Sequence, residues 1–412
     1  MSRPELIAEA RAELDGLVAA GRLRTRPVSS APVGRTVEFR QPGGRKVLIN
    51  WAANDYLGLA HFLPVRNGAA RALRRAGAGA GAARLLGGLA IHRQLEQAYA
   101  RFVNREDSLL TTSGYQANLC ALTALASDPE DALILDRMCH ASTYDGAKLA
   151  TGTVLRFAHN DVADLERQLA RTDTARRRIV CVESVYSMDG DEAPLAAIAE
   201  ACARHHAALI VDEAHALGVL GPGGRGLCAE AGVIPDLLVA TCSKSLGSQG
   251  GLIAGDSALI ELVVNRGRPF IYSTAPCPAA AGAAHTALAQ LARHPEWPGE
   301  LLAAAARLRD GLRAQGWDVP AGRSPIIPLI VGSEAAALAL AAKLAEAGHH
   351  APAIRPPTVP EGACRLRLTV TRAHRPSDLR KLLAAIGTHT AGSALGAPSA
   401  TNHQPPTTNH PD

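Results

Sequence analysis

The sequence predicts an α/β protein built on a largely parallel sheet, followed by a smaller α+β domain. Between about residues 130 and 255, short apolar runs alternate with longer amphipathic segments, which is the pattern of strands joined by crossover helices. These runs are apolar throughout, as is typical of strands covered on both faces. After about residue 285 the chain becomes rich in Ala, Leu and Arg at helical spacing, which indicates a second domain.

Five apolar runs are the expected strands of the large sheet: 132–136, 179–183, 208–212, 237–240 and 252–254. The amphipathic stretches 161–170 and 195–206 lie between them and are long enough to be helices. Asp136, Glu183 and Asp212 end three of the runs. Polar groups therefore gather at the carboxyl edge of the sheet, where open α/β sheets bind ligands.

The remaining segments give the domain plan. We expect an N-terminal helix and small-domain segment over 1–50, a large α/β domain over 51–285 and a C-terminal α+β domain over 286–387. Within the last we expect a helical stretch 287–314, strands 325–331 and 365–371, and helices 334–347 and 376–386. The tail 388–412 has no aromatic, Lys or Arg residue and is expected to be disordered.

Composition excludes several classes of protein. A net charge of +5 spread over 412 residues, with 3% aromatics, argues against a nucleic-acid binder. No apolar run approaches the ~20 residues that span a bilayer, and four acidic residues interrupt the first 15 positions, which is unlike a signal peptide. The eight cysteines include no C-x-x-C pair, and no His or Cys cluster has metal-ligand spacing. We expect a soluble cytoplasmic protein with no membrane segment and no metal.

One lysine stands apart from the others. The chain has only five, Lys46, Lys148, Lys244, Lys343 and Lys381, because it uses Arg for almost every positive charge. Arg can neither lose its proton nor form an imine, whereas Lys can do both. Lys244 follows an apolar run and lies among small and hydroxyl residues, whereas the other four fit solvated positions. A covalent role for Lys244 is one hypothesis, and an ordinary positive charge is the other.

A second motif strengthens the covalent hypothesis. Asp212-Glu213-Ala214-His215 follows the preceding strand, about 30 residues upstream. In enzymes that use pyridoxal 5′-phosphate (PLP), a carboxylate keeps the ring nitrogen protonated, which makes the ring an electron sink. The same letters spell a helicase box, but the chain has no G-x-x-x-x-G-K-[ST] loop. A G-x-G-x-x-G match at 221–226 contains Pro222 and fits a surface turn better than a nucleotide site.

Several ordered motifs resemble the α-oxoamine synthases, which are fold-type I PLP-dependent transferases (aspartate aminotransferase-like). The matching segments are 54–59, 113–118, 136–142, 183–191 and 212–215, and the similarity runs from about residue 19 to 386. Segments 353–360 and 365–369 look most like the biotin-pathway branch of that family. The resemblance implies a decarboxylative condensation of an amino acid with an acyl thioester.

The resemblance also implies roles for particular residues. Lys244 would attach PLP, Asp212 would pair with the pyridinium nitrogen, His215 would hydrogen-bond the cofactor's O3′, and His140 would stack on the ring. Further cofactor contacts would come from Gly114, Tyr115, Ser187 and Thr241, with Ser273 and Thr274 reaching the phosphate of the partner subunit in a homodimer.

The substrate residues follow in the same way. Asn54 and Arg367 would hold the carboxylate of the amino acid, and Thr358 and His140 would contact the substrate. Arg24 would meet the acyl substrate, although Arg22 or Arg26 could take its place.

For the biotin branch, the implied substrates are L-alanine and a pimeloyl thioester, carried on CoA or on an acyl carrier protein. Three departures from the family pattern, Ala83, Ala216 and Ser245, leave the acyl substrate open. The alternatives are a sister condensation (glycine with acetyl-CoA, glycine with succinyl-CoA, or serine with a long-chain acyl thioester), a catalytically idle PLP-fold protein, and a nucleotide-binding module.

Overall fold

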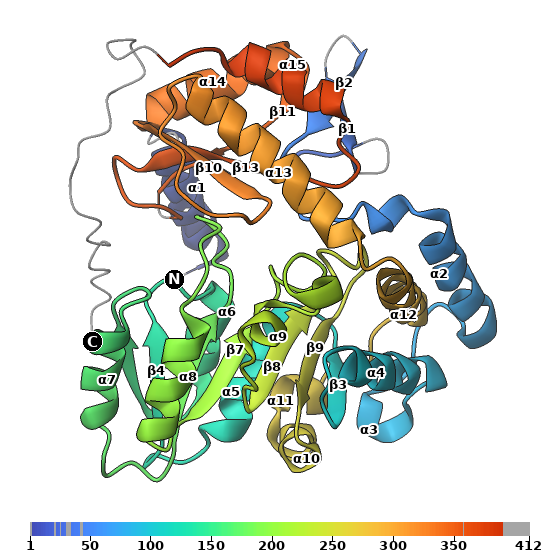
Figure 1. Ribbon diagram of the computed structural model, residues 1–412, viewed down its shortest axis with the longest axis vertical. Coiled ribbons are helices and arrows are strands. Elements are labelled where there is room, and N and C mark those ends of the chain that lie inside the picture. Colours follow the sequence, from blue (N-terminus) through green and yellow to red (C-terminus); the bar gives the residue numbers. More distant parts are fainter. Residues whose placement is uncertain are drawn as a thin grey trace.

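A computed structural model of the chain describes residues 2–19, 22–24, 26–29, 34–41, 44–356 and 358–389. Two regions are apparent in Figure 1: a large sheet wrapped in helices, and a smaller region built from the N-terminal strands and the C-terminal segments. The tail expected to be disordered lies outside the described residues from position 390 onward.

Seven strands form the large sheet in the order β3-β9-β8-β7-β6-β4-β5. Their bounds are β3 Asp107–Thr111, β4 Ala132–Asp136, β5 Thr153–Phe157, β6 Arg178–Glu183, β7 Ala208–Asp212, β8 Leu237–Thr241 and β9 Gly251–Gly255. Only β9 among them runs antiparallel to its two neighbours. The five predicted strands are confirmed. Sequence reasoning missed β3, and it missed the edge strand β5, whose first residues are exposed rather than apolar and buried.

Helices cover both faces of this sheet, as its apolar strands require. On one face pack α5 (Gly114–Leu125), α6 (Ala141–Leu149), α10 (Ser257–Arg266) and α11 (Arg268–Ile271). On the other pack α4 (Ala90–Phe102), α7 (Val162–Ala170), α8 (Leu195–Arg204), α9 (Leu227–Ala231) and α12 (Pro278–Arg293). Alternate residues of one strand enter opposite cores, since Leu133 packs on the first face and Ile134 on the second.

The smaller region contains two three-stranded sheets. One joins β1 (Thr36–Gln41) and β2 (Gly44–Asn50) to the short β11 (His349–His350), and the other has the order β10-β13-β12. The second sheet consists of β10 (Ile326–Gly332), β12 (Ala353–Ile354) and β13 (Cys364–Thr369), flanked by α14 (Glu334–Glu346) and α15 (Pro376–Ile386). The strands and helices predicted here are confirmed to within about two residues at each end, the usual uncertainty of element boundaries.

The predicted helical stretch 287–314 was wrong in one respect, because it is two helices. Helix α12 ends at Arg293 and α13 (Trp297–Ala314) begins after a break that contains Pro295, which cannot continue a helix. Helix α12 lies against α2 (Leu63–Ala76) so closely that a Cβ at Gly68 would come within 2.8 Å of the Gly282 carbonyl oxygen. The boundary expected at residue 285 therefore falls inside a helix that packs with the large sheet.

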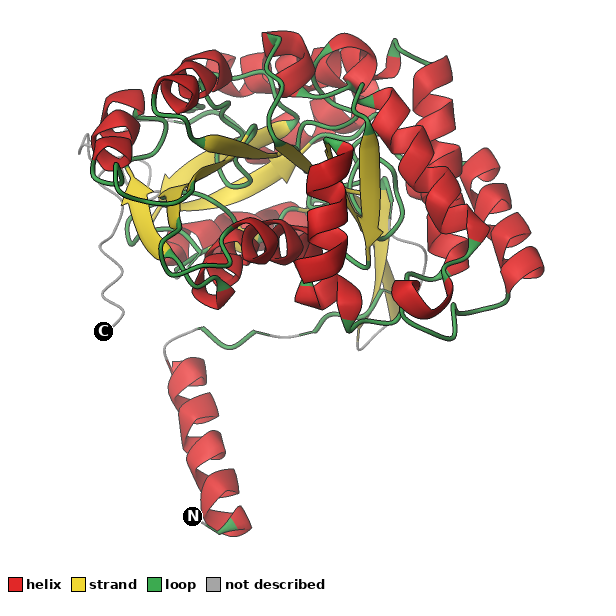
Figure 2. Ribbon diagram, turned by 90° about the horizontal axis from the view of Figure 1, so that it is seen from below, coloured by secondary structure: helices red, strands yellow, loops and turns green. Residues whose placement is uncertain are grey.

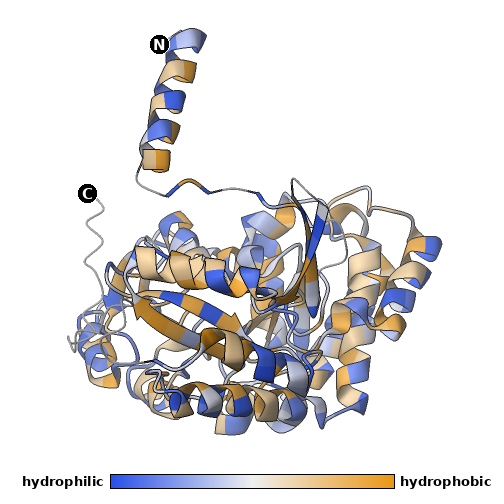
Figure 3. Cartoon of the chain, turned by 90° about the horizontal axis from the view of Figure 1, so that it is seen from above, coloured by the Kyte–Doolittle hydropathy of each residue, from blue (hydrophilic) through white to orange (hydrophobic). Residues whose placement is uncertain are grey.

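Helix α1 (Arg3–Ala19) confirms the predicted N-terminal helix, and no residue of it is buried. Figure 2 shows it standing away from the rest of the chain, and Figure 3 shows hydrophobic and hydrophilic residues along its length. The short α3 (Arg84–Gly87) and the 3₁₀ turns Leu59–His61 and Pro222–Gly224 complete the elements. Among the described residues, no helix has the length and apolar character needed to cross a membrane.

Candidate active site

The carboxyl ends of β6, β7 and β8 bring an acid, an acid and a lysine together. Glu183 and Asp212 are register partners at the ends of β6 and β7, and Lys244 follows β8 by three residues. Burial lowers the pKa of the Lys244 amine to about 8; Asp212 and Glu183 oppose this shift, and Arg367 adds to it. An amine with this pKa is partly neutral near physiological pH, as a nucleophile or general base must be.

Asp212 is held by donors on two sides. Its carboxylate accepts a hydrogen bond from Asn118 Nδ2 at 2.7 Å and from the Ala214 backbone N–H at 2.8 Å, and only 6% of the residue is exposed. These bonds fix the carboxylate beside Lys244. An acid placed in this way suits the protonated ring nitrogen of PLP.

His140 is the N-cap residue of α6 and is exposed. Its Nδ1 lies 2.8 Å from Ser142 Oγ and 3.2 Å from the Ser142 backbone nitrogen. The ring of Tyr115 lies edge-on at 6.3 Å between centroids, and the Tyr115 hydroxyl donates to Asp145. Partial removal from water lowers the pKa of His140, so the imidazole is neutral near pH 7.

His215 and Tyr56 form a buried pair. The Tyr56 hydroxyl lies 2.6 Å from His215 Nδ1. Burial, Lys244 and Arg367 all lower the pKa of His215, while burial raises the pKa of Tyr56. Both groups are therefore uncharged near neutral pH. Sequence reasoning placed Tyr56 in a matching motif but gave it no role.

The first turn of α5 offers backbone amides to an anion. Ser113 caps this helix by accepting from the Gln116 N–H at 3.2 Å. Gly114 lies against Thr241, since a Cβ at Gly114 would come within 3.1 Å of the Thr241 Cβ. Helix N-termini present unpaired N–H groups and a positive dipole end, so this turn suits a phosphate. Thr241 Oγ1 itself contacts Ser243 Oγ at 2.8 Å and the Gly250 carbonyl at 3.0 Å.

Ser273 and Thr274 lie beside the same helix end of their own chain. Ser273 Oγ accepts from Gln116 Nε2 at 3.2 Å, and both residues line a small hollow with Thr112 and Gln116. Thr274 is exposed and Ser273 is half-buried. A contact from these hydroxyls to a partner subunit's phosphate stays a prediction.

Arg367 joins the smaller region to the large sheet. From β13, its Nη1 donates to Asn54 Oδ1 at 3.1 Å and to Thr369 Oγ1 at 2.9 Å, and its Nε donates to the Ser187 carbonyl. The structure thus brings Asn54, Ser187 and Arg367 together, while the substrate and cofactor roles that the resemblance implied for them stay predictions. The Ser187 contact is through the backbone, and no contact of its hydroxyl is part of this arrangement.

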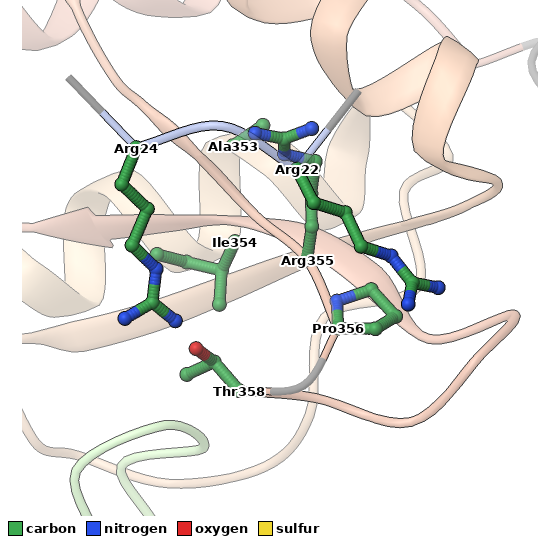
Figure 4. A pocket seen from close by; sticks show the side chains of 7 residues that line it. All are labelled: Arg22, Arg24, Ala353, Ile354, Arg355, Pro356 and Thr358. Carbon is green, nitrogen blue, oxygen red and sulfur yellow. The ribbon is translucent and has the colours of Figure 1, made fainter. Parts of the chain in front are cut away.

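A separate groove of about 180 Å³ brings together Arg22, Arg24 and Thr358, three of the residues that the resemblance linked to the substrate. Figure 4 shows the Arg24 side chain extending toward Thr358, with Arg22 beside Pro356. The full lining is Arg22, Arg24, Ala353, Ile354, Arg355, Pro356 and Thr358. Arg26 is exposed and does not line it. Strand β12, which forms one wall, pairs with β13 near Arg367.

Asn118 and Ser142 are site residues that sequence reasoning missed, and Glu183, which it placed at the carboxyl edge of the sheet, was given no role. Each lies inside a segment that matched the family, but its neighbours along the chain do not reveal its contacts. Asn118 and Ser142 are 2% and 1% exposed, and Glu183 is 3% exposed. A polar side chain at an otherwise apolar helix position was the available signal for Asn118, since a buried amide needs partners.

Comparison with known proteins identifies the family. Residues 46–386 match the aminotransferase class I and II family. The chain belongs to this family. The match covers the whole large sheet and most of the smaller region, and members of this family share the fold-type I PLP transferase fold that the sequence predicted. The chain is accordingly a PLP-dependent enzyme.

Individual members show where the chain lies within the family. It is 46% identical over 378 residues to "8-amino-7-oxononanoate synthase" of Anaeromyxobacter dehalogenans, covering 91% of this chain and 94% of that protein. A high-resolution structure of SPT (serine palmitoyltransferase) with a PLP internal aldimine superposes with a TM-score of 0.86 at 29% identity, covering 94% of this chain and 98% of that one. An 8-amino-7-oxononanoate synthase from Francisella tularensis has a TM-score of 0.71 at 24% identity, covering 82% and 96%, which shows the shared fold. The predicted resemblance to the α-oxoamine synthases is confirmed.

Proposed function

We propose that this enzyme condenses L-alanine with a pimeloyl thioester to give 8-amino-7-oxononanoate, a step of biotin biosynthesis. The Cα–H bond of alanine and the C–S bond of the thioester break, and a bond from Cα to the acyl carbon forms. The Cα–carboxylate bond then breaks and Cα takes up a proton, so CO2 and the free thiol leave. The observation that carries the proposal is the pairing of a catalytic edge (Lys244 beside Asp212) with the arginine-lined groove. The 46% identity to a protein named for this reaction supports it.

The residues at the carboxyl edge of the large sheet fit PLP. When bound, the cofactor supplies an electron sink for the carbanion character that develops at Cα. Asp212 would face the ring nitrogen, His215 the O3′ oxygen, and His140 the open ring face. The amides of Gly114 and Tyr115, with Thr241 beside them, would hold the phosphate. Ser187 would make a further contact from the domain junction.

Lys244 would move the proton at Cα. Its depressed pKa makes the amine neutral in a useful fraction of molecules, and a base works best when its pKa lies near the working pH. Asp212 and Glu183 keep the protonated form from becoming prohibitively costly, since opposite charges favour the ammonium. Lys244 can therefore accept the proton and later return it.

Asn54 and Arg367 would orient the amino acid through its carboxylate. Arg367 is 8% exposed, and its guanidinium forms a planar fork that matches a carboxylate. A small amino-acid side chain such as that of alanine leaves this contact undisturbed. The carboxylate must later depart as CO2, so its orientation relative to Cα decides which bond breaks.

The groove fits the far end of a pimeloyl chain, which is a carboxylate. Arg22 and Arg24 supply positive charge, Thr358 supplies a hydroxyl, and Ile354 and Pro356 supply apolar surface for methylene groups. Arg22 lies 3.8 Å from Glu361 and Arg355 pairs with Glu334, so Arg24 is the groove arginine to which a long saturated chain would offer no anion. We assign Arg24 as the principal contact because its side chain extends toward Thr358.

We further propose a homodimer with active sites at the subunit interface. Tyr272 is 71% exposed, and its neighbour Ser273 accepts a hydrogen bond from Gln116 in the first turn of α5. In the proposed dimer, Ser273 and Thr274 reach the phosphate of the partner subunit.

Mass spectrometry of the products tests the function. The purified enzyme is incubated with alanine, glycine or serine, each paired with pimeloyl-, acetyl-, succinyl- or palmitoyl-CoA. A product only from alanine and pimeloyl-CoA supports the proposal. The second candidate, a serine palmitoyltransferase-like reaction, is favoured by the SPT structure at 29% identity and predicts a product from serine and palmitoyl-CoA instead. Because pimeloyl groups can also be attached to a carrier protein, pimeloyl-acyl carrier protein is tested as a further acyl donor.

A further inference from the structure

Two side chains, Asn118 and Ser142, link the Asp212 carboxylate to the ring of His140 through hydrogen bonds. Asn118 Nδ2 lies 2.7 Å from Asp212 Oδ2 and 2.9 Å from Ser142 Oγ, and Ser142 Oγ lies 2.8 Å from His140 Nδ1. Asn118 and Ser142 are almost fully buried. Sequence reasoning assigned neither residue a role, and the proposed reaction requires neither of them to contact the substrate.

The direction of each hydrogen bond follows from donor and acceptor capacity. A carboxylate only accepts, so the amide nitrogen of Asn118 must face Asp212. The second proton of that nitrogen goes to Ser142 Oγ. Ser142 Oγ therefore accepts from Asn118 and has its single proton left to donate to His140 Nδ1.

Two further features favour an unprotonated Nδ1 on His140. The Ser142 backbone N–H also points to this atom at 3.2 Å, so Nδ1 caps the N-terminus of α6. A helix N-terminus disfavours a cation, because its dipole end is positive. Nδ1 therefore carries no proton, and the ring proton resides on Nε2, for which no described residue is a hydrogen-bond partner.

We propose that Asn118 and Ser142 are positioning residues that hold His140 as a neutral imidazole with its proton on Nε2, so that this N–H faces the ligand space. The role of His140 toward PLP rests on the proposed function, whereas the tautomer is a property of the chain alone. The same arrangement couples His140 to Asp212, because the Asn118 side-chain nitrogen donates one proton to Asp212 and the other to Ser142 Oγ.

Other charged groups near His140 must be considered in any titration. Asp212 at the end of β7 and Asp145 on α6 favour the protonated ring, Lys244 after β8 disfavours it, and Glu183 on β6 interacts with the His140 backbone. Tyr115 on α5 contributes a neutral ring edge. The hydroxyl and amide donors to Nδ1 act in the same direction as Lys244.

The test uses long-range ¹H–¹⁵N spectra of the histidine rings in the full-length protein, with and without PLP. The His140 signal is assigned from its absence in His140→Gln. In the wild type we expect the Nε2–H tautomer at pH 7. Ser142→Ala removes one donor to Nδ1, so the midpoint of His140 protonation should rise by up to about one pH unit. Asn118→Asp replaces the shared donor with an acceptor and should raise the midpoint further.

Thr143→Val is the matched control. Thr143 follows Ser142 in α6, is fully buried, and its hydroxyl has no hydrogen-bond partner among the described residues. Its removal should leave the His140 titration unchanged. In activity assays, the loss caused by Ser142→Ala should be largest at low pH and shrink as pH rises.

The proposal is overturned by an Nδ1–H or charged His140 at pH 7 in the wild type. It is equally overturned if Ser142→Ala titrates like Thr143→Val. Melting curves identify a variant that fails to fold, in which case the wild-type spectrum alone decides. Because these spectra require no turnover, they decide the tautomer even if the proposed reaction is wrong.

Discussion

Lys244 shows how a single amine is adapted by its surroundings. Burial destabilises its charged form, Asp212 and Glu183 stabilise that form, and Arg367 repels it. Burial outweighs the two carboxylates, so the pKa falls from 10.5 to about 8. At neutral pH the amine is therefore present in both its charged and its neutral form.

The first prediction concerns the pH dependence of this amine. In cofactor-free protein, covalent attachment of PLP requires neutral Lys244, so its rate should rise with pH and level off above about 8 rather than above 10.5. Stopped-flow absorbance of PLP binding measures this rate. Lys244→Arg should show no covalent attachment, because a guanidinium forms no imine. Lys148→Arg, at an exposed position of α6, is the control and should behave as the wild type.

A second prediction distinguishes the arginines near the acyl groove. Arg24→Ala should raise KM for the acyl thioester by about tenfold or more with a smaller effect on KM for alanine, because a charge-assisted hydrogen bond contributes about 1.5–3 kcal/mol. Arg26→Ala removes another exposed arginine, which does not line the groove, and should have little effect. Steady-state kinetics with each substrate varied separately provides the comparison. Equal effects of the two substitutions would contradict our assignment of Arg24.

At the scale of elements, the loop after β6 connects the two regions of the chain. Residues 184–192 receive Arg365 and Arg367 from β13, which bind Asp189 and the Ser187 carbonyl. From the large domain, His159 bridges Asp136 at the end of β4 and Asp191 in the loop, at 2.9 and 2.8 Å. The loop is thus fixed from both sides, and with it the position of Arg367.

The third prediction concerns the His159 bridge. Burial lowers the pKa of His159, but its two carboxylate partners outweigh burial and raise the pKa to about 10. Because the unfolded value is about 6.5, the stabilisation is fully present below pH 6.5, declines above it and is lost as pH rises through about 10. His159→Gln should therefore lower the free energy of unfolding at pH 6 by about 1–3 kcal/mol and by much less at pH 10.

Denaturant titrations at several pH values measure the His159 effect. The double variant with Asp191→Asn closes a mutant cycle and isolates the interaction between these two residues. A penalty for His159→Gln that does not change between pH 6 and 10 would show that the imidazolium charge is not what stabilises the loop.

At the scale of the whole molecule, the proposed dimer makes each active site depend on two chains. Lys244 would come from one subunit, and Ser273 and Thr274 from the other. A single chain would then be an incomplete enzyme even though its fold is complete. This arrangement has a direct experimental consequence.

The fourth prediction is complementation between two inactive variants. Lys244→Ala and the double variant Ser273→Ala, Thr274→Ala should each have low activity alone. After mixing, unfolding and refolding, random pairing makes about half of the dimers mixed, and one of the two sites in each mixed dimer is intact. Activity should recover to about a quarter of the wild-type value. No recovery, with mixed dimers demonstrated by tagged subunits, would place all of these residues in one chain's site.

The sequence alone determined the layered α/β fold, five of the seven large-sheet strands and the acidic strand ends. It could do so because buried strands are uniformly apolar and helices are amphipathic, so each element is specified locally. It also singled out Lys244, because an amine is chemically distinct from the arginines used elsewhere. Pro295 could also have predicted the break between the two helices, but the prediction of one helical stretch over 287–314 overlooked it.

Only the tertiary structure decided which side chains meet. Asn118, Ser142 and Asp212 lie on a helix, a second helix and a strand, and their hydrogen bonds depend on how these elements pack. The edge strand β5 escaped prediction because its first residues face solvent, and the join between Arg367 and Asn54 spans more than 300 positions of sequence. Local pattern encodes an element and its buried face, whereas the direction and partner of a polar side chain are set by distant residues.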